Sequence, residues 1–521
     1  MSGKTLKKIR VVVSLILFVS TSALFLDPRH SIPSAIGTIL VSLQFIPSLV
    51  RVFTGISFIL LGLLFVVGLS VLFGRVYCST LCPLGTFQDI IIHIEKKIHR
   101  RRRFEYKRSP FVFHYCLLAL MAGFAVAGSM TLLNLAEPFS NYGRILTNAV
   151  EPVVTLLNNG TAALLGRFEI YFLYNIPLRE VSLQVLLIPL VFLTVVTYMS
   201  YRHGRLFCNS LCPAGALLGL ISRLAVFKII INRQLCNDCG ACERVCKAAC
   251  IDTATKQIDF GACVGCFNCI KSCPTDGVVY SPARSQNREE IPAVYHPARR
   301  TFLRSVAAPT IGLTLPALVL HAEATAGTSG YEDSRKRPVT PPGSKSVRHF
   351  SSLCTACHLC VSACPSQVLY PSFLDYGIAG MFQPRMNYDA SYCNYECTVC
   401  GQVCPTGAIL PVNVESKKLI QIGRSVFVKD DCVVVTKKKD CAACSEHCPT
   451  KAVHMVPYEG KLSIPELNND ICVGCGACEH ACPTTPRKAI YVNANPVHLE
   501  AKKPPVKKQE PGFDSTKDFP F

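Results

Sequence analysis

The chain contains 30 cysteines among 521 residues, and most of them stand in short, regular runs that constrain the possible folds. The clearest run, Cys354–Pro365, reads C-x2-C-x2-C-x3-C-P. Its spacing places three thiols on one tight loop and a fourth just before a proline, a residue that suits the first turn of a helix. Six such runs use 24 of the 30 cysteines, so much of the chain must be built around sets of four thiols. In chain order they are Cys236, Cys239, Cys242 and Cys246 (run 1); Cys263, Cys266, Cys269 and Cys273 (run 2); Cys354, Cys357, Cys360 and Cys364 (run 3); Cys393, Cys397, Cys400 and Cys404 (run 4); Cys432, Cys441, Cys444 and Cys448 (run 5); and Cys472, Cys475, Cys478 and Cys482 (run 6).

Four cysteines at this spacing are typical ligands of a 4Fe–4S cluster. In two-cluster ferredoxins, the fourth cysteine of one run binds the cluster of the other run. We therefore predict six clusters, with runs 1 and 2 exchanging Cys246 and Cys273. The simplest pairing of the later runs exchanges Cys364 with Cys404 and Cys448 with Cys482. An interleaved pairing of outer with inner runs is also compatible with the sequence.

Three other interpretations of the cysteines are disfavoured. Structural zinc sites usually combine two distant C-x2-C pairs, and disulfide frameworks belong to small secreted domains. Cys354–His358 also matches the C-x-x-C-H motif of haem attachment, but this motif overlaps a complete run, so we expect His358 to be a solvated loop residue. Cys250 is a spare cysteine that could replace Cys246, although the spacing favours Cys246.

The formal charge of +20 does not indicate a nucleic-acid partner. An oxidised 4Fe–4S core with four thiolates carries roughly −2, so six clusters offset about 12 positive charges. The remaining excess of Lys and Arg lies largely in short runs beside apolar segments. We therefore attribute it to membrane topology and to contact with acidic lipids.

Four apolar segments are expected to cross a membrane as helices: Val11–Leu26, Val52–Gly74, Pro110–Ala136 and Val181–Tyr201. The first resembles a signal peptide, but no small-residue cleavage site follows it, so we expect it to be retained. Ser31–Val50 is uncharged but contains two prolines, and we expect a surface or re-entrant segment there.

The distribution of basic residues predicts the orientation of these spans. The loop Lys96–Arg108 contains eight Lys and Arg residues, whereas Glu137–Glu180 contains three. Cytoplasmic loops carry the excess of positive charge. The basic N-terminus and the first loop are therefore expected in the cytoplasm, and the second loop outside.

An internal repeat supports this layout. Gly74–Gly85 reads GRVYCSTLCPLG and Gly204–Gly215 reads GRLFCNSLCPAG, each at the end of a predicted span. Repeats with the same orientation imply a pseudo-two-fold axis along the membrane normal. Four thiols would then meet near that axis and form a possible extra redox or metal site, since thiolate sets select Fe–S clusters, zinc or Cu(I). These cysteines are Cys78, Cys82, Cys208 and Cys212, whereas Cys116 is expected to pack in a span.

The chain thus divides into a membrane domain (1–227), a two-cluster domain (228–282), a linker (283–347), a four-cluster domain (348–495) and a polar tail (496–521) that we expect to be disordered. Within the linker, residues 298–326 combine Arg299-Arg300-Thr-Phe-Leu, an apolar stretch and small residues. This is the composition of a twin-arginine export signal placed inside the chain. A basic linker with a short buried helix is the alternative.

The repeat followed by runs 1 and 2 resembles NapH, the membrane subunit of periplasmic nitrate reductase systems, and NosR and MauN share this module. The RRTFL segment and runs 3 to 6 resemble NapG, so nearly the whole chain is similar to a NapH–NapG fusion. The resemblance implies a multi-pass protein of the bacterial inner membrane whose C-terminal domain is periplasmic. It also implies electron transfer from the quinone pool to a periplasmic reductase or cytochrome. An assembly or regulatory role for another metalloenzyme is the alternative that NosR suggests.

No P-loop, dinucleotide fingerprint or non-cysteine metal site stands out, so we expect the chemistry to reside in the clusters. We assign no catalytic residue, although the chain could serve as a quinol dehydrogenase subunit. Glu137 and Glu151 at the predicted outer face are candidates for a quinone site, but we expect them to be solvated carboxylates at the rim of the bundle.

Overall fold

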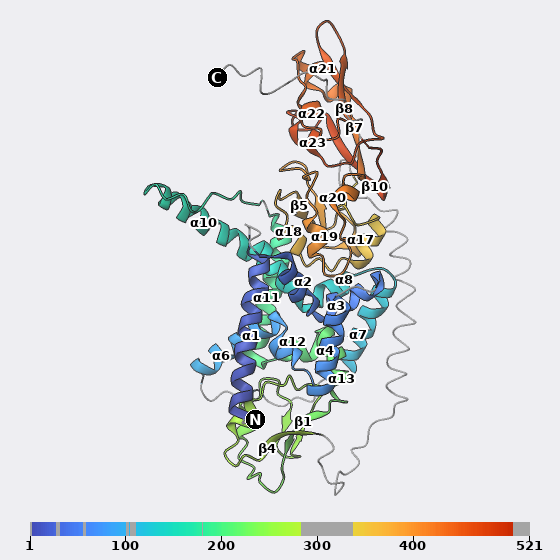
Figure 1. The fold of residues 1–521 in the computed structure, drawn as a ribbon. Helices are drawn as coiled ribbons and strands as arrows, with labels where there is room; N and C mark the ends of the chain where they lie inside the picture. The colour runs from blue at the N-terminus through green and yellow to red at the C-terminus, as the bar shows by residue number, and fades with distance from the viewer. Residues whose placement is uncertain are drawn as a thin grey trace, which may run out of the picture.

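The computed structural model describes residues 3–27, 32–55, 59–99, 104, 111–179, 181–282 and 337–503. A helical bundle occupies the centre of the molecule (Figure 1). A small domain with runs 1 and 2 lies at one end of the bundle, and a larger domain with runs 3 to 6 lies at the other end. We refer to these parts as the bundle (3–222), the run 1–2 domain (227–282) and the run 3–6 domain (337–503).

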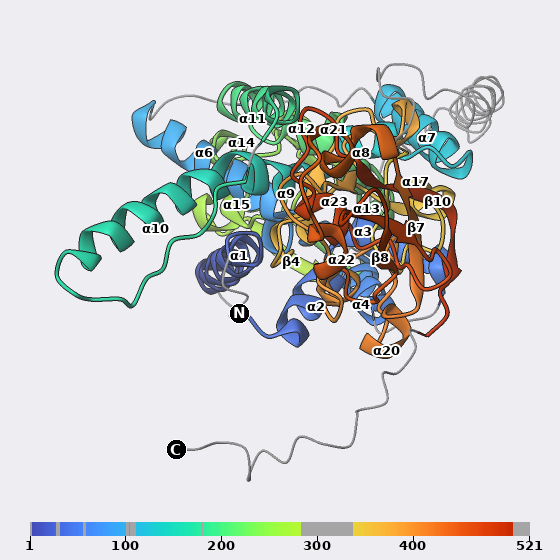
Figure 2. The ribbon, with the colours of Figure 1, turned by 90° about the horizontal axis from the view of Figure 1, so that it is seen from above.

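The bundle consists of helices and short helical turns. They are α1 (Gly3–Phe25), α2 (Ser34–Ser42), α3 (Phe45–Arg51), η1 (Val52–Thr54), α4 (Ile59–Phe73), α5 (Tyr77–Thr80), α6 (Pro83–Ile98), α7 (Phe111–Val126), α8 (Thr131–Ala136), α9 (Pro138–Ile145), η2 (Leu146–Val150), α10 (Glu151–Gly166), α11 (Leu183–His203), α12 (Leu206–Ser210) and α13 (Pro213–Ser222). Helix α10 projects sideways from the other helices as an arm (Figure 2).

Two helices of the described residues, α1 and α11, are long and apolar enough to cross a membrane. The apolar helices α4 and α7 are shorter, with 15 and 16 residues. Helix α2 and the continuous pair α3–η1 are bent by 98° relative to each other, which is the geometry of a broken span or a re-entrant loop. This bend lies between Ser42 and Phe45, within the stretch Ser31–Val50 in which we expected a surface or re-entrant segment.

The two GRxxCxxLCPxG segments adopt the same local structure. In each, a glycine with positive φ, Gly74 or Gly204, ends a long helix, and the second cysteine precedes a proline that begins the next helix. Arg75 Nη2 donates to the carbonyl of Cys208 at 2.9 Å, and Arg205 Nη1 donates to the carbonyl of Cys78 at 2.7 Å. The arginine of each segment is therefore bound by the first cysteine of the other segment.

The run 1–2 domain is a small α+β unit. Its elements are β1 (Phe227–Ile231), α14 (Ala241–Arg244), β2 (Ile251–Asp252), β3 (Gln257–Ile258), α15 (Asn268–Ser272) and β4 (Val278–Pro282). Strands β1 and β4 pair antiparallel, as do β2 and β3, and helix α14 packs on α15. Because each of these helices begins within a cysteine run, their contact brings runs 1 and 2 together.

The run 1–2 domain is attached to the bundle by hydrogen bonds to its backbone and by a buried ion pair. Arg205 N donates to the carbonyl of Lys247 at 2.9 Å, and Lys247 Nζ lies 3.2 Å from Asp89 Oδ1. Arg75 Nη1 donates to the carbonyl of Gly261 at 2.6 Å. The arginines of both GRxxC segments therefore also hold the neighbouring domain.

The run 3–6 domain contains two units of similar build. Its elements are α17 (Val347–Leu353), α18 (Leu359–Ser362), β5 (Leu369–Pro371), η4 (Ile378–Gly380), β6 (Pro384–Met386), α19 (Val399–Val403), α20 (Val414–Lys417), β7 (Ile420–Phe427), η5 (Lys429–Asp431), α21 (Val433–Lys437), α22 (Ala443–Glu446), β8 (Val453–Pro457), β9 (Ser463–Leu467), α23 (Ala477–Ala481) and β10 (Ile490–Glu500). The antiparallel pairs are β5–β6, β7–β10 and β8–β9. Helix α18 packs on α19, and α22 packs on α23.

The end of the bundle opposite the run 1–2 domain contacts the run 3–6 domain at run 3 and at the residues that follow it. Arg179 Nη2 donates to the carbonyl of Val361 at 2.9 Å, and Thr131 Oγ1 donates to the carbonyl of Ile378 at 2.6 Å. The guanidinium of Arg144 lies 4.8 Å from the centre of the Phe382 ring. The predicted export segment at 298–326, most of the linker and the end of the tail lie outside the described residues.

Gly85 and Gly215 occupy equivalent positions, and their substitution should disturb the contact between the two segments. A Cβ at Gly85 would collide with the carbonyl oxygen of Cys78 in its own segment and with Nη1 of Arg205 from the other segment. A Cβ at Gly215 would likewise collide with the carbonyl oxygen of Cys208 and with Nη2 of Arg75. We expect Gly85→Ala or Gly215→Ala to destabilise the protein by about 1–3 kcal/mol, because close-packed backbone cannot yield freely. The midpoint of thermal unfolding in detergent, followed by circular dichroism, would measure this loss.

Gly68→Ala is the matched control, since a Cβ at this position in α4 meets no atom within 4 Å. Alanine is favoured over glycine in a helix interior by about 1 kcal/mol, so this variant should unfold at the same or a higher temperature. Equal midpoints for all three variants would contradict the close packing around Gly85 and Gly215.

Candidate iron–sulfur centres

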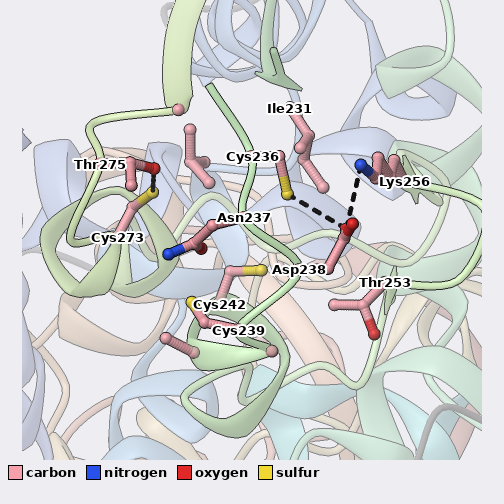
Figure 3. A pocket seen from close by; sticks show the side chains of 14 residues that line it. Ile231, Cys236, Asn237, Asp238, Cys239, Cys242, Thr253, Lys256, Cys273 and Thr275 are labelled. Atoms are coloured by element: carbon pink, nitrogen blue, oxygen red, sulfur yellow. Dashed lines mark hydrogen bonds and ion pairs between the residues drawn. The ribbon is translucent and has the colours of Figure 1, made fainter. Parts of the chain in front are cut away.

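The first thiol-lined cavity lies in the run 1–2 domain (Figure 3). Its volume is about 400 Å³, part of which is open to solvent, and its lining includes the first three cysteines of run 1 and the last of run 2, namely Cys236, Cys239, Cys242 and Cys273. The loop of run 1 wraps this space because Gly240, with φ of 64°, turns the chain immediately before α14. Cys273 reaches the same space from the end of α15. These are the four thiols that the crosswise pairing predicts.

A second cavity of about 330 Å³ lies in the same domain and has five cysteines in its lining: Cys246, Cys250, Cys263, Cys266 and Cys269. Four of them are the set predicted by the exchange of fourth cysteines. The fifth, Cys250, has its sulfur 3.6 Å from the sulfur of Cys246. This spare cysteine therefore lies in the cavity of run 2 rather than near the first three cysteines of run 1.

The run 3–6 domain repeats this arrangement at runs 5 and 6. A cavity of about 290 Å³ is lined by Cys448, Cys472, Cys475 and Cys478. The complementary set consists of thiols that lie close enough to influence one another's pKa. Burial raises the pKa of Cys444 to about 12, and the nearby charges of Cys441 and Cys482 contribute to this rise. Cys432 lies near the same two thiols. Runs 5 and 6 thus exchange their fourth cysteines in space.

Runs 3 and 4 are grouped in the same way. Burial raises the pKa of Cys360 well above its usual value, and the nearby charges of Cys354, Cys357 and Cys404 act in the same direction. Burial also raises the pKa of Cys400, with a contribution from the charges of Cys393, Cys364 and Cys397. The structure therefore brings together neighbouring runs and not the interleaved pairs.

These thiol sets fit a group larger than one metal ion. Three of the sets line cavities, as four irons at the corners of one cluster would need. Within the described residues, no group of three or more His, Cys, Asp and Glu side chains forms a site for a single ion. Buried thiols with raised pKa values gain from iron ligation, which stabilises the thiolate form. When bound, a 4Fe–4S cluster supplies one-electron redox chemistry.

Hydroxyl groups stand beside the fourth cysteine of five runs. In each case, a Ser or Thr two residues further along the chain places its Oγ between 3.1 and 3.8 Å from the cysteine sulfur. Hydrogen bonds to ligating sulfur atoms are one means by which a protein sets the potential of a cluster. The pairs are Cys273–Thr275, Cys364–Ser366, Cys404–Thr406, Cys448–Thr450 and Cys482–Thr484.

The cysteines of the two GRxxC segments, Cys78, Cys82, Cys208 and Cys212, are all buried within one core. Burial raises the pKa of Cys212 well above its usual value, and the charges of Cys208, Cys78 and Cys82 add to the rise. Gln88 Nε2 lies 3.5 Å from the Cys208 sulfur. The structure therefore brings the four thiols near one another, although they do not converge on a single point.

Three expectations about polar residues are wrong. His358 is buried, not solvated, with only 1% of its surface exposed. Its Nε2–H donates to the carbonyl of Phe382 at 2.8 Å, so Nδ1 accepts from Asn148 Nδ2 at 3.2 Å. Burial lowers the pKa of His358 to about 3, and the ring is neutral. His358 thus joins the run 3 loop to the bundle.

The two candidate carboxylates are also not solvated, since Glu137 is buried and Glu151 is partly buried, with 14% of its side chain exposed. Glu137 caps the N-terminus of α9 and accepts from the backbone N–H of Phe139 at 2.9 Å. Glu151 forms an ion pair with Arg179 at 3.2 Å. Both carboxylates therefore have structural partners. The sequence contained a signal for the first, since Glu137 precedes a proline at a helix start.

Two family models match parts of the chain. A 4Fe–4S binding domain matches residues 56–102 and 184–232, which contain the two GRxxC segments, and a 4Fe–4S dicluster domain matches residues 353–408 and 439–485. No solved structure matches the chain.

Curated relatives agree with these matches. YccM of Escherichia coli (strain K12), named as a candidate electron transport protein, is 29% identical over 40% of this chain, which covers 50% of that relative. The ferredoxin-type protein NapF of the same organism is 29% identical over 30% of the chain and 87% of its own length. The ferredoxin-type protein NapG of that organism is 30% identical over 35% of the chain and 80% of its own length.

The chain spans half the length of YccM but most of the length of NapF and NapG. The cysteine runs, the thiol-lined cavities and these relatives agree with one another. The chain therefore belongs to the Nap-type family of ferredoxin-like 4Fe–4S polyferredoxins, which are iron–sulfur electron-transfer proteins.

Proposed function

We propose that this polyferredoxin is a multi-pass protein of the bacterial inner membrane that passes electrons from quinol to a periplasmic reductase of the nitrate-reductase type. The observation that carries the proposal is the position of the thiol sets. The run 1–2 domain and the run 3–6 domain lie at opposite ends of an apolar helical bundle (Figure 1). In a membrane that enclosed the bundle, cluster-bearing domains would lie on both sides.

The proposed topology has four spans, built on α1, α4, α7 and α11, with α2 and α3 as a re-entrant pair. The basic loop Lys96–Arg108 places the run 1–2 end in the cytoplasm by the positive-inside rule. The run 3–6 domain then lies in the periplasm. The segment at 298–326 would carry the chain across the membrane between the two domains, by the twin-arginine route.

The 24 cysteines of the six runs are the proposed ligands of six 4Fe–4S clusters. Pairs of neighbouring runs exchange their fourth cysteines, which agrees with the thiols that line each cavity. Each ligand set combines one compact loop with one cysteine from the partner run. Loss of Cys273, the fourth cysteine of run 2, should therefore damage the cluster of run 1.

We further propose that the two GRxxC segments are halves of an internal duplication and that their four cysteines form an additional redox or metal site. The reciprocal bonds from Arg75 to the Cys208 carbonyl and from Arg205 to the Cys78 carbonyl support the duplication. The match of one 4Fe–4S binding domain to both segments supports it as well. These thiols lie between the two cluster-bearing ends.

Protein purified under anaerobic conditions should contain about 24 iron atoms per chain in its six clusters, four in each. Cys273→Ser should lower this content to about 20, because one complete cluster would lose a ligand. Iron and acid-labile sulfide analysis would measure both values. Cys116→Ser, which changes a cysteine in α7 outside every run, is the control and should keep all the iron.

Double variants test the crosswise pairing. Cys239→Ser with Cys273→Ser should lose no more iron than either single variant, because both cysteines serve the first cavity. Cys266→Ser with Cys273→Ser should lose about eight irons, since these cysteines serve two clusters. The reverse pattern would contradict the pairing, and stoichiometric zinc with little iron would contradict cluster ligation altogether.

A quinol should reduce the clusters of the full-length protein in membrane vesicles. We expect a quinol analogue to bleach the visible iron–sulfur absorbance of the oxidised protein, with dithionite defining complete reduction. Clusters that dithionite reduces and quinol does not would contradict the electron-relay proposal. That result would instead favour an assembly or regulatory role for another metalloenzyme.

Reporter fusions should distinguish the two ends of the bundle. A chain ending after Pro282 should give fluorescence with green fluorescent protein and no activity with alkaline phosphatase, because this end is assigned to the cytoplasm. The full chain fused after Phe521 should be active with the phosphatase, which folds only outside the cytoplasm. Cytoplasmic reporting at both positions would rule out the crossing.

A further inference from the structure

The second thiol-lined cavity has one cysteine more than a cluster needs. Cys250 is buried, with 2% of its surface exposed, and its backbone N–H points at the Cys246 sulfur at 3.5 Å. The two sulfur atoms lie 3.6 Å apart. Because a 4Fe–4S cluster takes one cysteine for each of its four irons, the fifth thiol requires an explanation.

The position of Cys250 corresponds to that of the hydroxyl groups beside the other fourth cysteines. In runs 2 to 6, the fourth cysteine is followed by proline and then by a Ser or Thr whose Oγ lies close to its sulfur. Run 1 has Lys247 and Ala248 at these positions and therefore no hydroxyl. In run 1, the group beside the fourth cysteine is instead the thiol of Cys250. Unlike the five hydroxyl groups, a thiol is a strong iron ligand when deprotonated.

The backbone after Cys246 is held by the bundle, which explains why run 1 departs from the pattern. The carbonyl of Lys247 accepts from Arg205 N at 2.9 Å, and the ammonium of Lys247 is paired with Asp89. The carbonyl of Ala248 accepts from Asn209 Nδ2 at 3.2 Å. Cys246 is thus tied to the bundle, whereas Cys250 begins the return into β2 of the run 1–2 domain.

We propose that Cys250 is a reserve ligand that replaces Cys246 on the same iron of the second cluster. This inference rests on the cluster ligation proposed above. In the exchange, the Fe–S bond to Cys246 breaks and an Fe–S bond to Cys250 forms. The proton of the Cys250 thiol passes to the Cys246 sulfur, so charge and oxidation state are unchanged. A short S–S separation allows this exchange without rebuilding the loop.

A reserve ligand at Cys250 would allow the second cluster to stay bound even if the Lys247–Ala248 segment lost its contacts with the bundle. When the Lys247–Ala248 segment shifts against Arg205 and Asn209, Cys246 must move with it, because it is the adjacent residue. Cys250 stands three residues beyond Lys247, and its side chain is hydrogen-bonded to that of Cys263 in the cavity lining. With Cys250 as the reserve ligand, the second cluster would keep four thiolates if this segment moved.

The test measures iron and acid-labile sulfide in full-length protein prepared anaerobically, together with the electron paramagnetic resonance spectrum after reduction. Cys246→Ala and Cys250→Ala should each retain the wild-type content of about 24 iron atoms. The double variant Cys246→Ala with Cys250→Ala should lose about four. Cys246→Ala should also shift the resonance of one cluster, because one iron has a new ligand with a different orientation.

Cys273→Ala is the matched control. Its neighbouring group is the hydroxyl of Thr275, at 3.5 Å, which cannot replace a thiolate, so this single substitution should cost about four irons. Equal iron loss in Cys246→Ala and Cys273→Ala would overturn the proposal, and the spectrum of the remaining clusters would show that the chain had folded. Iron loss in Cys250→Ala alone would also overturn it, by making Cys250 the resident ligand.

The controls separate this inference from the ligation on which it rests. If wild-type protein contains no iron, the cluster assignment itself fails. If wild-type protein is fully loaded and Cys246→Ala is not, only the reserve role of Cys250 fails.

Discussion

The buried carboxylate of Asp89 joins the N-terminal helix, the second GRxxC segment and the run 1–2 domain. Asp89 on α6 lies 2.9 Å from Arg10 on the N-terminal helix and 2.8 Å from Arg205 of the second GRxxC segment. It also pairs with Lys247, which belongs to the run 1–2 domain. Burial alone would raise the pKa of Asp89, but the charges of Arg205, Lys247 and Arg10 outweigh burial and hold it well below the usual range. The carboxylate is therefore ionised at any physiological pH.

This cluster of charges defines how the bundle and the first cluster-bearing domain meet. A buried charge without partners is costly, so three cations can be buried here only around an anion. Removal of the Asp89 charge would leave the guanidinium of Arg205, which is fully buried, beside two further cations. The same residue, Arg205, also binds the carbonyls of Cys78 and Lys247. The contact between the GRxxC segments and the attachment of the domain thus share one electrostatic centre.

Cysteine spacing made the thiol sets predictable because it is a local property. Three thiols within seven residues, as in Cys354–Cys360, must share one loop. The fourth thiol, placed after a short helix, points to the neighbouring unit. The apolar segments were recognisable for a similar reason, since hydropathy depends on composition alone. At α4 and α7, the observed helices are shorter than the predicted segments. The number of times that the chain crosses the membrane is part of the proposed function.

The contacts between the parts were not predictable from the sequence. Lys247 and Asp89 lie 158 positions apart in the chain, and nothing in the sequence around either one marks them as partners. His358 was misjudged as solvated because its partners, Asn148 and the carbonyl of Phe382, are distant in the chain. Such polar contacts have no periodicity and depend on the tertiary arrangement, so spacing and composition do not reveal them.

The run 3 loop has two roles, because the residues between its cysteines also form its surface against the bundle. His358 lies between Cys357 and Cys360, and the carbonyl of Val361, immediately after Cys360, accepts from Arg179. With the ligation proposed above, iron shapes the surface by which the domain attaches. Any change in the geometry of this loop is therefore felt in two places, at the thiols of Cys357 and Cys360 and at the contact of His358 with Asn148 of the bundle.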